Sequence, residues 1–156
     1  MDENEYRNAY HSINQTRCVF EKSILTRTCN CQHARKFNLA EREGVGCKDE
    51  QAQALCSQFL NTVRQQARFA LKLADIVGNL LPHNKEIQVQ KGALLGLLPD
   101  LPNLPDTPIE DIASLLGQAQ ANHGAQLETL PYGALIQSIV HHPPRERRRR
   151  REKNRT

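Results

Sequence analysis

The feature that most constrains the fold is a long amphipathic segment in the middle of the chain. From Glu50 to about Ala74 the apolar side chains recur at three- and four-residue steps, which places them on one face of an α-helix. Asp49 stands immediately before this segment, where its carboxylate can accept hydrogen bonds from the first free backbone amides. We therefore predict a long helix from Glu50 to Ala74 with Asp49 as its N-cap. Its apolar face consists of Cys56, Phe59, Leu60, Val63, Ala67, Ala70 and Leu71.

Similar patterns predict helices near both ends of the chain. Apolar positions from Asp2 to about Leu25 recur at helical spacing and predict a first helix that ends near Thr28. Thr107 and Pro108 are residue types preferred at a helix start, which predicts a helix from Pro108 to about Asn122. A last short helix is expected from Pro131 to His141. The stretch from Glu86 to Gln90 alternates polar and apolar residues like a short strand or an extended connection.

The composition agrees with a helical fold of ordinary domain size. Of the 156 residues only 4% are aromatic, which suits helices packed through aliphatic side chains better than a β-sheet. We predict an all-α fold that begins with an antiparallel hairpin of long helices carrying a cysteine-bearing loop. The expected organisation is a helical cysteine-rich metal-binding region at 1–98, a proline-rich connection at 99–107, a C-terminal helical pair at 108–142 and a disordered basic tail at 143–156.

Five cysteines are gathered in the first part of the chain, with the spacing Cys18-x10-Cys29-x-Cys31-x15-Cys47-x8-Cys56. An odd number of cysteines cannot be paired completely into internal disulfides. Between Cys29 and Cys47 the pattern is irregular apart from a short helix expected from Gln32 to Glu43, and the glycines of Gly44-Val45-Gly46 permit a close wrap of the backbone. A helical hairpin around this loop would bring the thiols toward one end of the molecule. Because several thiolates close to one point can bind a metal, this arrangement predicts a metal centre.

The expected metal centre is an iron-sulfur cluster, with zinc as the alternative. The spacing matches neither the ferredoxin runs nor the paired Cys-x2-Cys knuckles of common zinc sites, but the apolar neighbours of the thiols suit a cluster pocket of low polarity. The expected ligands are Cys29, Cys31 and Cys47 together with Cys18 or Cys56. His33 is a further candidate, although such a histidine is more often a solvated loop residue. Buried or redox-active thiols without metal are the other interpretation.

The C-terminal tail is strongly basic. Residues 143–156 carry a charge of +6 in a chain whose net charge is +4, so the rest of the chain carries −2. Arginine forks bind phosphate, so the tail predicts contact with nucleic acid, while a solubilising role or contact with acidic proteins or anionic lipid are the other interpretations. The arginines expected to contact phosphate are Arg145, Arg147, Arg148, Arg149, Arg150 and Arg151.

The sequence favours a non-catalytic role, because it contains no Gly-rich phosphate loop, no Gly-x-Ser-x-Gly elbow and no His-Glu-x-x-His helix. Its start lacks a secretory signal and no apolar stretch is long enough for a membrane span, so we expect a cytoplasmic protein with reduced thiols. The expected function is that of an iron-sulfur protein in electron transfer, redox sensing or structural support, with a protein partner. The alternative is a nucleic-acid-associated adaptor with a structural zinc or thiol core and a phosphate-binding tail.

Overall fold

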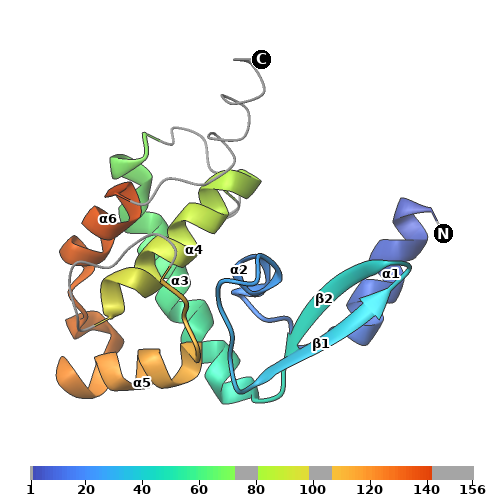
Figure 1. Ribbon diagram of the computed structural model, residues 1–156, viewed down its shortest axis with the longest axis horizontal. Coiled ribbons are helices and arrows are strands. Elements are labelled where there is room, and N and C mark those ends of the chain that lie inside the picture. The colour runs from blue at the N-terminus through green and yellow to red at the C-terminus, as the bar shows by residue number, and fades with distance from the viewer. Residues whose placement is uncertain (1, 73–80, 99–106, 142–156) are drawn as a thin grey trace.

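The computed structural model describes residues 2–72, 81–98 and 107–141. These residues are mostly helical but include a two-stranded antiparallel sheet, so the prediction of an all-α fold is wrong. Figure 1 shows α1 beside the β-hairpin at one end and the helices α3 to α6 gathered at the other. In chain order the elements are α1 (Glu3–Ile13), α2 (Glu21–Leu25), β1 (Ala34–Leu39), β2 (Arg42–Cys47), α3 (Glu50–Ala70), α4 (His83–Leu97), α5 (Ile112–Asn122), a 3-10 turn (Leu127–Thr129) and α6 (Tyr132–His141).

The hairpin of β1 and β2 stands where the short helix from Gln32 to Glu43 was expected. Its register pairs Leu39 with Arg42 and leaves Ala40 and Glu41 as a two-residue loop. Both loop residues have left-handed backbone angles, with φ of 48° and 69°, as a type I′ turn requires. Neither is the glycine or asparagine usual at such positions, so no residue at this point indicates a turn.

The first helix is shorter than the predicted range of Asp2 to Thr28, because the segment after it leaves the helix to pair with β2. The buried side-chain amide of Asn14, the residue that follows α1, donates a hydrogen bond of 3.1 Å to the backbone oxygen of Val45. The backbone N–H of Cys18 donates to the same oxygen. These contacts with β2 prevail over the local helical pattern. The predicted hairpin of two long helices is therefore replaced by a short helix, a pairing segment and a β-hairpin.

The helix α3 confirms the prediction made from the central amphipathic segment. Oδ1 of Asp49 accepts hydrogen bonds from the backbone N–H groups of Gln51 and Ala52, at 3.0 and 3.1 Å, so Asp49 is the N-cap. The helix ends at Ala70 rather than Ala74. Four residues of the predicted apolar face are fully buried, namely Phe59, Leu60, Val63 and Ala67.

The helix α4 includes the stretch from Glu86 to Gln90 that was expected to be extended. The alternation of polar and apolar residues does not mark a half-buried strand here. The polar side chains of Gln88 and Gln90 are buried in the helix along with the apolar Val89. Close contact with α6 is possible because Gly92 has no side chain. A Cβ atom at Gly92 would lie 2.6 Å from the Cα atom of Ile139. This close approach lets the backbones of α4 and α6 pack directly together.

The helix α5 begins at Ile112 rather than at the predicted Pro108, because the residues before it pair with the cysteine-bearing segment. The backbone N–H of Asn30 donates to the carbonyl oxygen of Ile109 over 2.8 Å, and the N–H of Ile109 donates to the carbonyl oxygen of Thr28 over 3.0 Å. This extended pairing connects the first part of the chain to the C-terminal helices. The apolar face of α6 belongs to the core, since Leu135 and Ile139 are fully buried.

One apolar core extends from Phe20 to Ile139 and joins the N-terminal segments to the C-terminal helices. The division into regions proposed from the sequence stays a prediction, and residues 99–106 of the predicted connection and the predicted tail at 143–156 lie outside the described residues. None of the helices that the structure describes combines the length and apolarity needed to cross a bilayer.

Candidate metal centre

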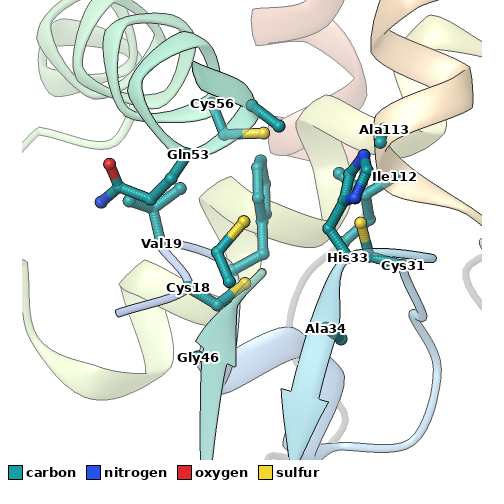
Figure 2. Close-up of a pocket in the computed structure, with 13 residues that line it drawn as sticks. Cys18, Val19, Cys31, His33, Ala34, Gly46, Gln53, Cys56, Ile112 and Ala113 are labelled. Carbon is teal, nitrogen blue, oxygen red and sulfur yellow. The ribbon is translucent and has the colours of Figure 1, made fainter. Parts of the chain in front are cut away.

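Four of the five cysteines line one small pocket of about 20 Å³. They come from separate parts of the chain: Cys18 precedes α2, Cys31 precedes β1, Cys47 ends β2 and Cys56 lies in α3. Figure 2 shows the sulfur atoms of Cys18, Cys31 and Cys56 around this pocket, with the imidazole of His33 near Cys31. The fold therefore brings together thiols that are widely spaced in the sequence.

The outer edge of β2 positions Cys18 and Cys47. The backbone N–H of Cys47 donates to the carbonyl oxygen of Thr16 over 2.7 Å, which fixes the pairing segment beside the strand. A Cβ atom at Gly46 would lie 2.7 Å from the side-chain oxygen Oδ1 of Asn14, so a larger residue at this position would displace the Asn14 side chain. The thiol of Cys47 donates to the backbone oxygen of Asp49 over 3.1 Å. The residue that caps α3 thus also holds Cys47 next to the helix that carries Cys56.

The segment that carries Cys31 is tied to the start of α5. The backbone N–H of Gln32 donates to Oδ1 of Asp111 over 3.1 Å, and the side-chain amide of Gln32 donates to Oδ2 over 2.9 Å. The N–H of Ile112 donates to the carbonyl oxygen of Asn30 over 2.9 Å. Because these bonds flank Cys31 on both sides, a helix that is remote in sequence fixes its position.

The pocket favours the neutral form of three of its thiols. Burial raises the pKa of Cys18 and that of Cys56 to about 12, and it also raises the pKa of Cys31. Backbone amides act in the opposite direction, since the amide of Phe20 lowers the pKa of Cys18 and those of His33 and Ala113 lower that of Cys31. A bound cation would supply the positive charge that thiolates in this pocket lack. Much of the remaining lining is apolar: Val19, Phe20, Ala34, Ala52, Ile112 and Ala113.

Cys29 is not among the residues that line this pocket. Its side chain is 5% exposed and lies where the chain pairs with Ile109. The hydroxyl oxygen of Thr28 is 3.9 Å from its sulfur. Burial raises the pKa of Cys29, and the positive charge of Lys91 opposes that effect. Cys29 is therefore a core residue that anchors the segment leading to Cys31.

The ligands expected from the sequence are only partly brought together. Cys18, Cys31, Cys47 and Cys56 share the pocket with His33, whereas Cys29 lies elsewhere. Within residues 2–72, 81–98 and 107–141, no group of three or more His, Cys, Asp or Glu side chains is already assembled to hold a metal ion. Metal ligation by any of the five cysteines therefore stays a prediction. The arginines of the tail, Arg145 and 147–151, lie outside the described residues, so phosphate contact stays a prediction too.

A buried polar network beside the pocket was not found from the sequence. Oε1 of Gln90 accepts hydrogen bonds from the hydroxyl and the backbone N–H of Ser23, at 2.8 and 3.2 Å. The amide nitrogen of Gln90 donates to the backbone oxygen of Val19 over 3.1 Å and to the carboxylate of Glu86. Glu86 in turn pairs with Arg64 of α3. The network holds in place the segment that follows Cys18. The feature of the sequence that could have indicated it is the number of polar residues between Glu86 and Gln90.

Comparison of the chain with protein-family models, with curated proteins and with solved structures gives no match.

Proposed function

We propose that the protein binds an iron-sulfur cluster through Cys18, Cys31, Cys47 and Cys56, and that it serves a redox role without catalysing a reaction. The observation that carries this proposal is that these four thiols line one pocket. Iron-sulfur clusters are commonly held by four cysteine thiolates, which is the number present. The proposed set differs from the one expected from the sequence, because it includes both Cys18 and Cys56 and omits Cys29.

The chemistry of the pocket supports thiolate ligation. Without a cation the raised pKa values keep Cys18 and Cys56 protonated at neutral pH, and coordination to iron deprotonates a thiol. The backbone amides that act on Cys18 and Cys31 would stabilise the thiolates, and such amides also adjust the reduction potential of a cluster. Each cysteine sulfur turns about a single side-chain torsion, so the thiols can reorient toward a cluster while the backbone stays in place.

The distribution of the ligands favours a cluster over a single zinc ion. Each of the four cysteines comes from a separate segment, and no two of them form the Cys-x2-Cys pair typical of structural zinc sites. Zinc is nevertheless bound well by four thiolates and is the alternative metal. The proposal therefore requires an experiment in which iron, sulfide and zinc are measured together.

The exposure of the thiols favours redox sensing or electron transfer over a purely structural role. Cys18, Cys31, Cys47 and Cys56 are all partly exposed, so one edge of a bound cluster would meet solvent or a partner protein. Exposed clusters and thiols are also the ones that oxidants reach most readily. A cytoplasmic location suits this role, because a reducing compartment keeps the thiols available for metal.

The test is anaerobic purification of the full chain, followed by iron, acid-labile sulfide and zinc analysis and a visible absorption spectrum. The proposal expects iron and sulfide in similar amounts, with a broad absorbance that dithionite bleaches. Bound zinc together with four thiols protected from titration would reject the iron-sulfur cluster and support a zinc site. A metal-free protein with five titratable thiols, even after reconstitution with iron and sulfide, would reject the proposed function.

A further inference from the structure

A second and larger cavity lies next to the cysteine pocket. Its volume is about 240 Å³, and it shares Cys18, Val19 and Gln53 with the lining of the cysteine pocket. The two cavities are therefore neighbours with a common wall. Unlike the cysteine pocket, this one is lined largely by charged and polar residues: Arg17, Glu21, Lys22, Arg64, Glu86 and Gln90.

Two ion pairs account for four of the charges that line this cavity. Nη2 of Arg17 lies 3.1 Å from Oε1 of Glu21, and Arg64 pairs with Glu86. The side chains of Glu21 and Glu86 are only 9% and 6% exposed. The other oxygen of Glu21 accepts hydrogen bonds from the hydroxyl of Tyr10 and the backbone N–H of Val45. Both carboxylates are thus satisfied within the protein and do not call for a cationic ligand.

Lys22 is the charged residue of the cavity lining that belongs to neither ion pair. It lies on α2 and is partly buried at the cavity wall. Within the described part of the chain, its ammonium group has neither a carboxylate partner nor a hydrogen-bond acceptor. Arg17, beside it in the lining, uses Nη2 for its ion pair and keeps other N–H donors for a ligand. A partly desolvated cation without a partner is stabilised most by an anion.

We propose that this cavity binds a small anion carrying a carboxylate or phosphate group, with Lys22 and Arg17 as its counter-charges. The inference deepens the proposed function, because Cys18 belongs to the walls of both cavities. An anion bound there changes the charge beside one proposed ligand of the cluster, and so couples the presence of a small metabolite to the redox centre. The binding of the anion itself does not depend on the cluster.

The direct test is isothermal titration calorimetry on the reduced, metal-free full chain at constant ionic strength. The probes are inorganic phosphate, acetate and acetamide, which is a neutral analogue of acetate. We expect saturable binding of phosphate or acetate and none of acetamide. Lys22→Gln is expected to weaken binding roughly tenfold, because it removes a charge-assisted contact. Lys36→Gln is the matched control, since Lys36 is exposed on β1 and does not line this cavity.

The arginine tail is present in every variant, so phosphate bound by the tail does not depend on Lys22. Equal affinities for the parent and Lys22→Gln, or no saturable binding of either anion, would overturn the proposal.

In the iron-loaded protein, a saturating anion should shift the electron paramagnetic resonance spectrum of the reduced cluster in the parent but not in Lys22→Gln. An unshifted spectrum despite measured binding would overturn the coupling. If no cluster forms, the proposed function fails while the calorimetric result still decides whether the anion binds.

Discussion

Cys18 and Cys56 line the same pocket, where burial raises the pKa of Cys56 and a negative charge on Cys18 raises it further. One residue belongs to the segment that pairs with β2 and the other to α3. Two thiolates in one pocket repel each other unless a cation lies between them. Protonation, metal binding and folding stability are therefore linked at this pocket.

The first prediction concerns alkaline pH. In the folded, metal-free protein the pKa values of Cys18 and Cys56 are raised from 9.0 to about 12. Between pH 9 and about pH 12 these two thiols lose their protons in the unfolded chain but keep them in the folded protein. The free energy of unfolding therefore falls as pH rises through this range. Urea unfolding of the reduced, metal-free protein at a series of pH values above neutrality measures this fall. Cys56→Ala should make the fall shallower, and an unchanged slope in that variant would contradict the assignment.

The second prediction concerns Gln90, whose amide bonds to both Ser23 and Val19. Gln90→Ala leaves buried polar groups of the segment after Cys18 without partners, so we expect a loss of about 1–3 kcal/mol in the free energy of unfolding. Chemical denaturation measures the loss. The control is Gln58→Ala on the exposed side of α3, for which a change within about 0.5 kcal/mol is expected. Equal effects of the two substitutions would mean that the network contributes little.

The third prediction compares two helical glycines. Gly92→Ala should destabilise the protein by about 1–3 kcal/mol, because the added Cβ would lie 2.6 Å from the backbone of Ile139. Gly117→Ala in α5 should stabilise it by about 0.5–1 kcal/mol, since nothing lies within 4 Å of that position and alanine favours the helix. Thermal unfolding of the two variants measures both effects. An unchanged thermal stability of Gly92→Ala would show that α4 and α6 do not pack as closely as described.

Local patterns in the sequence predicted the helices whose formation depends mainly on local residues. Asp49 and the apolar face behind it correctly indicated α3, because the cap and the periodicity both lie within the helix. The β-hairpin was missed because Ala40 and Glu41 adopt a turn for which they carry no sequence signal. The end of α1 was missed because Asn14 is held by Val45, a contact between residues far apart in the sequence. Tertiary contacts of this kind prevail over local propensity.

The candidate site was predictable as a group of thiols but not as a particular set. Because Cys31 lies in an irregular loop, it was expected to act together with Cys29. The pairing of the chain with Ile109 instead holds Cys29 in the core, while the hydrogen bonds of Asp111 fix the segment of Cys31 at the pocket. Both contacts involve residues near α5. No local pattern around the cysteines contains that information.

The most direct test of the central claim is the iron and sulfide content of single cysteine variants, purified anaerobically under identical conditions. We predict that Cys18→Ser, Cys31→Ser, Cys47→Ser and Cys56→Ser each lose the cluster, because each removes one of the four thiols that share the pocket. Cys29→Ser should keep it, and Cys29→Ala serves as a second variant if a buried hydroxyl disturbs the core. Circular dichroism checks that every variant is folded. A folded Cys29 variant that loses its cluster while Cys18→Ser or Cys56→Ser retains one would contradict the account.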